Sequence, residues 1–197
     1  MKLAVILGTT RQGRQTEKQA LWVVNAATQI EDVEVELIDL NDYPMPFFAE
    51  PASPRYNPAR EIDAVAQKWL ARLEAADAYI FVTPEYNHSI PGVLKNALDY
   101  IDFQLNRKPA AIVSHGSVGG ARAAMHLREI VSESRAVTIP HTVAFHGVSS
   151  DIDEAGTINE ALRANPYGPQ AALEGLLAEL KWYSDALAGA RVPALAI

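Results

Sequence analysis

Three short polar segments carry the side chains that could do chemistry in this chain of 197 residues. The first, GTTRQGRQT at residues 8–16, combines hydroxyl groups with two arginines. The second, TPEYNHSIP at 83–91, holds an acid, a tyrosine, an amide and a histidine between two prolines. The third, SHGSVGG at 114–120, is rich in glycine. The chain contains no cysteine, so thiol nucleophiles, zinc thiolate sites and disulfides are excluded.

The segment 8–16 has the side chains that a phosphate site needs. Hydroxyls, guanidinium groups and the free amides at the start of a following helix can converge on one phosphate. These side chains are Thr9, Thr10, Thr16, Arg11 and Arg14. The alternative is a polar turn whose Thr or Gln side chain caps the helix. The signature GxxxxGK[ST] is absent, and nothing nearby resembles a magnesium site, so a phosphomonoester fits better than a triphosphate.

The other two segments suit a flat ligand. Pro84 and Pro91 bias the residues before them to extended conformations, so the backbone polar groups between them are held in fixed positions. Such groups suit the edge of a planar heterocycle, and Tyr86 offers an aromatic wall. The glycines of 114–120 allow a ligand or a backbone to approach closely. The alternatives are a proline-rich connection without a ligand and a tight turn with glycine as helix N-cap.

Apolar runs of strand length alternate along the chain with segments of helical period. Continuous apolar runs predict buried parallel strands, and the alternation in VEVELIDL predicts a strand near the edge of the sheet. The expected strands are 3–7, 33–40, 78–82 and 110–114, with a fifth at 136–139 or 142–145. The expected helices are 16–27, one that starts at Asn57 and Pro58, 92–105, 119–134 and a last one that includes 173–183.

This alternation predicts an α/β fold with a doubly wound, five-stranded parallel sheet, helices on both faces and a single domain over 1–197. The turn after the first strand, GTTRQGR, does not match GxGxxG, so the flavodoxin-like order 2-1-3-4-5 is preferred to 3-2-1-4-5. Ligands bind such sheets at the carboxyl ends of the strands, where all three polar segments are expected. A phosphate site beside a flat-ring site there describes a mononucleotide with a large ring, FMN.

Charge and hydropathy limit the partners. The formal net charge of -7 disfavours nucleic acid and anionic membranes, because both require a basic surface. No stretch approaches the roughly 18 to 20 apolar residues of a membrane span, and the N-terminus lacks a cleavage site, so we expect a cytoplasmic protein. We expect no metal site, because His141 and His146 would point to opposite faces of a strand.

Three motifs resemble the NADPH-dependent FMN reductase family of flavodoxin-like proteins, which includes quinone, azo-dye and chromate reductases. GTTRQGR resembles the family's G-S-x-R-x-x-S/R, PEYNHSIPGVLKNALDY its P-E-Y-N-x-S-x-P-G-x-L-K-N-A-L-D, and GGARAAMHLREI its G-G-A-R-A-x-x-H-L-R. Departures are Thr9, where the family usually has Ser, and Arg14 and Gln15, where many members have Ser and an aromatic residue.

The resemblance implies an FMN cofactor and assigns residues to it. The residues implied to bind its phosphate are Thr9, Arg11, Arg14 and Thr16. The residues implied to border the isoalloxazine, largely through backbone groups and the Asn87 amide, are Pro84, Glu85, Tyr86 and Asn87, with His115, Gly116 and Ser117 on the other side.

The implied reaction passes hydride from NADPH or NADH to FMN and then to a second molecule in a ping-pong mechanism. The acceptor would be a quinone, an azo compound, a metal oxyanion or free flavin. No catalytic side chain is expected, because the flavin carries the redox chemistry. An FMN-binding electron carrier without intrinsic NAD(P)H activity is the alternative. A receiver-type module is disfavoured, because Gly8 and Thr9 stand where it needs an aspartate.

The expected helix 92–105 predicts an oligomer. One apolar stripe, able to pack on the sheet, consists of Leu94, Leu98, Ile101 and Leu105. A second stripe consists of Val93, Ala97, Tyr100 and Phe103. A helix that is apolar on two sides needs a second partner. We therefore expect a homodimer or homotetramer through this helix, as the family resemblance also implies.

Overall fold

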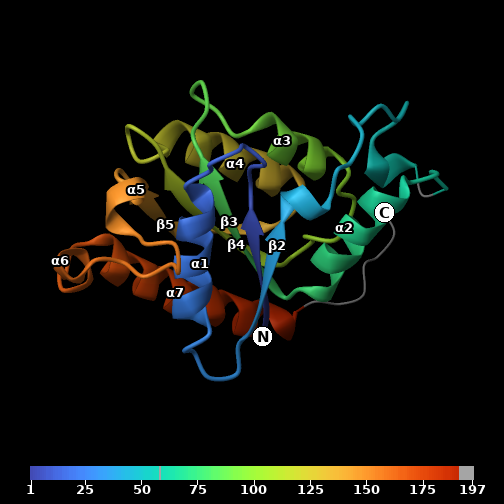
Figure 1. Ribbon diagram of the computed structural model, residues 1–197. Helices are drawn as coiled ribbons and strands as arrows, with labels where there is room; N and C mark the ends of the chain where they lie inside the picture. The colour runs from blue at the N-terminus through green and yellow to red at the C-terminus, as the bar shows by residue number, and fades with distance from the viewer. Residues whose placement is uncertain (58, 191–197) are drawn as a thin grey trace.

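The structure is a computed structural model that describes residues 1–57 and 59–190 (Figure 1). A parallel sheet of five strands forms its centre, in the order β2-β1-β3-β4-β5. The strands are β1 (Lys2–Leu7), β2 (Glu34–Asp39), β3 (Ala78–Pro84), β4 (Pro109–His115) and β5 (Val137–Phe145). The predicted flavodoxin-like order is confirmed, and β2 lies at an edge of the sheet as its alternating sequence indicated.

Helices cover both faces of the sheet (Figure 1). One face carries α1 (Thr16–Ala27) and α7 (Pro169–Ala188), and the other carries α2 (Ala64–Ala75), α3 (Gly92–Asp99) and α4 (Ala121–Glu133). The short elements are η1 (Leu40–Asp42), η2 (Pro54–Tyr56), α5 (Val148–Asp151) and α6 (Glu160–Arg163).

Each face of the sheet has its own hydrophobic core, because successive side chains of a strand point to opposite faces. In β1, Leu3, Val5 and Leu7 pack beneath α1 and α7, while Ala4 and Ile6 pack beneath α2 to α4. The central strands are therefore buried on both sides, which accounts for their continuous apolar runs.

The start of α2 was predicted wrongly. The helix begins at Ala64, not at Asn57, and Pro58 lies outside the described residues. The carboxylate of Asp63 accepts hydrogen bonds from two amides of the first turn, at 2.8 and 3.3 Å. Because this cap satisfies the exposed amides of the helix end, the helix starts there.

The predicted helix 92–105 is also shorter than expected, since α3 ends at Asp99. The carbonyl oxygen of Tyr100 accepts a hydrogen bond at 2.8 Å from Nη2 of Arg60. A carbonyl group near the end of the helix thus has a hydrogen-bond partner from a distant part of the chain, Arg60. Residues 101–108 continue as turns.

The two alternatives for the fifth strand belong to one strand. Strand β5 spans both of them and pairs with β4 on either side of an irregularity. Pairing passes from Thr138 to Thr142 while β4 advances from Ala110 to Ile112. Pro140 lies in this interval and has no N–H to give to a ladder, which fits the break in register.

The second apolar stripe of α3 is covered largely by the chain itself. Ala97 and Tyr100 are buried. The ring of Phe48 lies 5.2 Å from that of Tyr100, and Trp69 Nε1 donates to the Ala97 carbonyl at 2.9 Å. Phe103 remains 41% exposed. Most of this stripe is therefore packed within one chain, so its apolar character does not by itself require a partner.

An ion-pair anchor holds the long connection between β2 and α2 against the end of α3. Arg60, whose side chain is 3% exposed, contacts Glu50 at 2.8 Å and Asp102 at 3.0 Å. These two ion pairs join Glu50 and Arg60 of the connection to the segment that follows α3. No helix of the described residues is long and apolar enough to cross a bilayer.

Candidate functional site

The three polar segments follow β1, β3 and β4 and lie together at the carboxyl ends of these strands (Figure 1). We call residues 8–15 the first loop, 85–91 the middle loop and 116–120 the third loop. The amide of Gly8 donates to the Val82 carbonyl at 2.9 Å, and the amide of Glu85 donates to the His115 carbonyl at 2.9 Å. Backbone hydrogen bonds therefore join each loop to the next strand.

Thr9 connects the first loop to the middle loop. Its side chain is buried, and its Oγ1 lies 3.2 Å from the hydroxyl of Tyr86. The guanidinium of Arg11 lies over the ring of Tyr86, 5.4 Å from its centre. Arg11 itself is exposed. The predicted phosphate residues and the predicted aromatic wall are thus in direct contact.

Arg14 lies inside the first loop and serves mainly to hold it. Its Nη1 donates to the Thr9 carbonyl and to Asp39, both at 2.7 Å, and its Nη2 donates to the second oxygen of Asp39. Its Nε donates to Glu17 at 3.5 Å. Four of the five guanidinium N–H groups are used in this way. The hydrogen bond to Asp39 is the main cause that raises the pKa of Arg14.

A polar pocket of about 560 Å³ opens beside the first loop. Lys18 on its rim is paired with Glu154 at 2.7 Å, while Arg11 contributes an exposed cation. The lining is formed by Thr10, Arg11, Gln12, Gly13, Arg14, Gln15, Glu17, Lys18, Asn41 and Glu154. Two carboxylates, Glu17 and Glu154, belong to this lining and are paired with Arg14 and Lys18, so the cation that it offers to an anionic group of a ligand is Arg11.

Thr16 and His115 join α1 to β4. Thr16 is the first residue of α1 and is buried, and its Oγ1 lies 2.8 Å from Nε2 of His115. Burial lowers the pKa of His115 to about 4, so its imidazole is neutral at pH 7. The sequence placed these two residues at opposite ends of a ligand, but the structure brings them into contact.

The middle loop is a tight hairpin rather than only a proline-stiffened connection. Tyr86 and Ser89 exchange two backbone hydrogen bonds, at 2.9 and 3.0 Å. Asn87 and His88 between them have φ values of 48° and 68°. Two consecutive residues with positive φ are typical of a type I′ turn. The signal was Asn87, because asparagine tolerates this conformation better than most residues.

Glu85 caps α4 from the middle loop, a role that the sequence did not reveal. The N-cap of α4 is Gly120, which has no side chain to serve the first amides. Oε2 of Glu85 accepts a hydrogen bond from the Arg122 amide at 3.0 Å, and Oε1 lies 3.2 Å from Arg122 Nε. The carboxylate, 6% exposed, is therefore used between elements of the protein.

The third loop approaches the backbone closely at its glycines. A Cβ on Gly120 would lie 2.8 Å from the His115 amide nitrogen, and one on Gly116 would lie 3.2 Å from Cβ of Glu85. Gly120 has a φ of 76° and is the N-cap of α4, so the alternative of a tight turn with a glycine N-cap is confirmed. Ser117 is exposed beside it.

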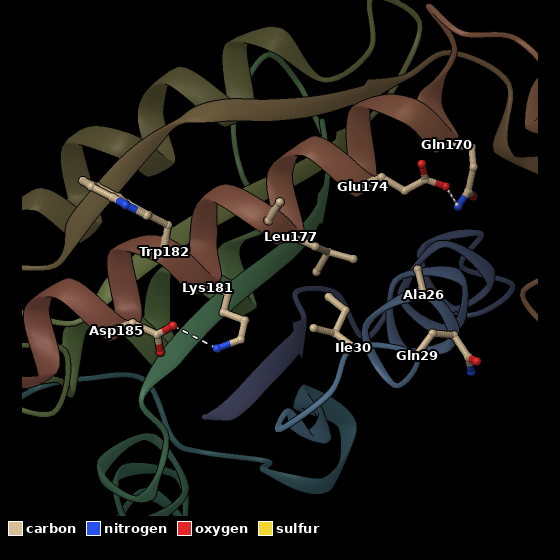
Figure 2. Close-up of a pocket in the computed structure, with 10 residues that line it drawn as sticks. Ala26, Gln29, Ile30, Gln170, Glu174, Leu177, Lys181, Trp182 and Asp185 are labelled. Carbon is tan, nitrogen blue, oxygen red and sulfur yellow. Dashed lines mark hydrogen bonds and ion pairs between the residues drawn. The ribbon is translucent and has the colours of Figure 1, made fainter.

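A larger and more apolar hollow, of about 670 Å³, lies elsewhere, between α1 and α7 (Figure 2). Ile30 and Leu177 point into the space between the two helices. Lys181 pairs with Asp185 at 2.8 Å along its side. It adjoins the end of α1 opposite to Thr16, so it lies away from the three loops. Because it lies away from the three loops, we do not assign the candidate site to this hollow.

Comparisons with known proteins identify the family of this chain. A family model described as NADPH-dependent FMN reductase matches residues 1–149. An NAD(P)H-dependent FMN reductase of Schizosaccharomyces pombe is 33% identical over 159 residues, covering 75% of this chain and 78% of the relative. A quinone reductase of Pseudomonas putida is 28% identical over 173 residues, covering 82% of this chain and 86% of the relative.

Among solved structures, the flavoenzyme NAD(P)H:(acceptor) oxidoreductase FerB of Paracoccus denitrificans is similar in fold. The TM-score is 0.67 at 22% identity, and the match covers 95% of this chain and 97% of that chain.

Proposed function

Because the chain belongs to the NADPH-dependent FMN reductase family, we propose that FMN binds at the carboxyl ends of β1, β3 and β4 and that NAD(P)H and an electron acceptor react there in turn. As a member of this family the protein is an oxidoreductase that works with FMN and NAD(P)H. The observation that carries the proposed site is the convergence of the three polar loops at one edge of the sheet.

The residues at this edge fit FMN in their chemistry. The first loop offers the exposed guanidinium of Arg11 and the start of α1, both suited to a phosphate. The middle loop offers a backbone fixed by hydrogen bonds, and the glycines of the third loop let its backbone pack closely against Glu85 and His115 at the same edge. When bound, FMN supplies the redox chemistry, accepting hydride from a nicotinamide and passing electrons to an acceptor.

The side chains of this chain bind and orient rather than react. We assign the phosphate to Arg11 and Thr16, with Thr9 and Arg14 holding the loop around it. The ring edge is assigned to the backbone of residues 84–87 and to the backbone of residues 115–117. Glu85 takes part through its backbone, because its carboxylate caps α4.

The proposed acceptor is a quinone or another flat or electron-poor species, namely an azo compound, a metal oxyanion or a free flavin. The name of the Pseudomonas putida relative supports the quinone. Nicotinamide and acceptor would use the same exposed ring face in succession. This predicts ping-pong kinetics, seen as parallel double-reciprocal plots when one substrate is varied at several concentrations of the other.

We also propose a homodimer or homotetramer through α3. The observation that supports it is Phe103 of the second stripe, which is 41% exposed. Sedimentation velocity at micromolar concentration tests it. A Phe103→Ser variant should shift the population toward monomer, and a wild-type protein that sediments as a monomer contradicts the assembly without touching the assignment of the flavin site.

The decisive experiment for the function is the visible spectrum of the purified protein, reconstituted with FMN, before and after anaerobic NADPH or NADH. Flavin bands that bleach with NAD(P)H and return with a quinone support the reductase. Bound flavin that NAD(P)H fails to bleach would identify an electron carrier instead. Protein that binds no FMN would contradict the proposed site.

A further inference from the structure

The contact between Thr16 and His115 joins the proposed phosphate end of the site to the third loop. Oγ1 of Thr16 and Nε2 of His115 are 2.8 Å apart, and the two residues are separated by 99 positions in the sequence. Thr16 is the first residue of α1, where backbone amides point out of the helix. Thr16 is 1% exposed, so a phosphate would contact its hydroxyl by entering the start of α1, and one side of the hydroxyl is already occupied by His115.

Which of the two groups donates the proton in this hydrogen bond decides whether the Thr16 hydroxyl can donate to a second partner. A neutral imidazole has one N–H and one bare nitrogen, and a hydroxyl has one O–H and two lone pairs. If Thr16 donates to Nε2, only lone pairs remain, and these repel an anion. If Nε2 carries the proton and donates to Oγ1, the hydroxyl proton remains for a second partner.

We propose that His115 is a positioning residue for the phosphate of FMN: its Nε2–H donates to Thr16 Oγ1, so that the Thr16 hydroxyl proton is left to donate to a phosphate oxygen. This inference rests on the proposed function. It changes the role expected for His115, which acts on the phosphate end through Thr16. Riboflavin lacks the phosphate, so the difference in affinity between FMN and riboflavin depends in part on the side chain of His115.

Dissociation constants of apoprotein for FMN and for riboflavin, from quenching of flavin fluorescence, test the proposal. His115→Ala should weaken FMN about fivefold to tenfold and change riboflavin less than about twofold, because only a hydrogen bond to a charged group is affected. Thr16→Val should have a similar effect. The double variant should be no weaker than Thr16→Val alone, since the two residues act as one unit.

Two further variants separate positioning from folding. His115→Gln places an amide N–H near the position of Nε2–H and should restore most of the affinity for FMN. His126→Ala is the matched control, because His126 also contacts a hydroxyl, that of Ser89 at 3.1 Å, but on the outer part of α4. It should leave the ratio of FMN to riboflavin affinity unchanged. The ¹⁵N chemical shifts of His115 should show the proton on Nε2 in the FMN complex.

Three results would overturn the inference while leaving the proposed function intact. They are equal losses of FMN and riboflavin affinity in His115→Ala, additive losses in the double variant, and a proton on Nδ1 in the complex. Wild-type protein that binds neither flavin overturns the proposed function itself, and this inference with it, before any variant is made.

Discussion

The first loop and the middle loop border the same site but are held in different ways. The first loop depends on charged side chains, because Arg14 binds both the Thr9 carbonyl and Asp39 at the end of β2. The middle loop depends on backbone hydrogen bonds within its hairpin and to β4. Two charged side chains contribute to it: the carboxylate of Glu85 serves the start of α4, and the guanidinium of Arg11 lies over Tyr86.

This difference corresponds to the two ends of the proposed ligand. A ring with flat faces needs an edge of fixed shape, which backbone hydrogen bonds provide. A phosphate needs positive charge, and the first loop provides it with one arginine committed to structure and another exposed. Changes of shape should therefore damage the middle and third loops, whereas changes of charge should affect the first.

The largest effect is expected for Gly120→Ala, which disturbs the backbone conformation and the close packing of the third loop. A left-handed conformation costs a residue with a side chain about 1 to 3 kcal/mol, and a Cβ 2.8 Å from the His115 nitrogen adds about as much again. We expect the free energy of unfolding to fall by about 3 to 5 kcal/mol in urea denaturation. Gly13→Ala is the control, because Gly13 also has positive φ, yet a Cβ there meets no described atom within 4 Å. It should cost about 1 to 2 kcal/mol, and equal losses would contradict this account.

The next effect concerns the pH dependence that His115 contributes. Its pKa is about 4 in the folded protein and 6.5 in the unfolded chain, so the unfolded state takes up the proton first as pH falls. Stability from this group is complete above pH 6.5 and is lost progressively toward pH 4, by up to about 3 kcal/mol. The difference in unfolding free energy between wild type and His115→Gln, measured at pH 7 and pH 4, should change by this amount. A constant difference would show that His115 is not kept neutral by burial.

Glu85→Ala should rank third, since it removes a carboxylate that holds the middle loop to α4. Loss of the cap and of the contact with Arg122 should lower the unfolding free energy by about 2 kcal/mol. Glu85→Gln keeps an oxygen for the Arg122 amide and should lose about half as much. Thermal or urea denaturation measures both, and similar losses in the two variants would show that charge, not capping, matters here.

The smallest effects on stability distinguish the two arginines of the first loop. Arg14→Gln should lose about 1.5 kcal/mol, because its hydrogen bonds to Asp39 are shielded from water. Arg11→Gln should change stability by about 0.5 kcal/mol at most, since its contact with Tyr86 is exposed. For FMN affinity at low salt the Arg11 change should cost about threefold to tenfold. If Arg14→Gln were neutral for folding, the first loop would not depend on this charge.

The sequence predicted the architecture because the relevant signals are local. Each buried strand is a short apolar run, and the absence of GxGxxG after β1 was enough to choose the strand order. The three loops follow directly from that order, since parallel strands place their carboxyl ends together. The fold and the location of the candidate site could therefore be predicted together.

What the sequence could not predict depends on partners far apart in the chain. Asn57 and Asp63 are equally good N-caps by residue type, and Arg60, which lies between them in the sequence, has partners on the α3 side about 40 residues away. The roles of Glu85 and His115 depend on contacts separated by 37 and 99 positions. No local pattern encodes these pairings.

The carboxylate of Glu85 also gives the site a direction. Two helices, α1 and α4, begin at this edge, and the start of each carries the partial positive charge of the helix dipole. At α4 that charge is already neutralised by Glu85, whereas Gln15, the N-cap of α1, makes no capping hydrogen bond through its side chain to the described residues. At the proposed site, an anionic group would therefore find the start of α4 occupied by a carboxylate, whereas at the start of α1 the nearby carboxylate, Glu17, faces Arg14. A ligand with one charged end would then have a single favourable orientation.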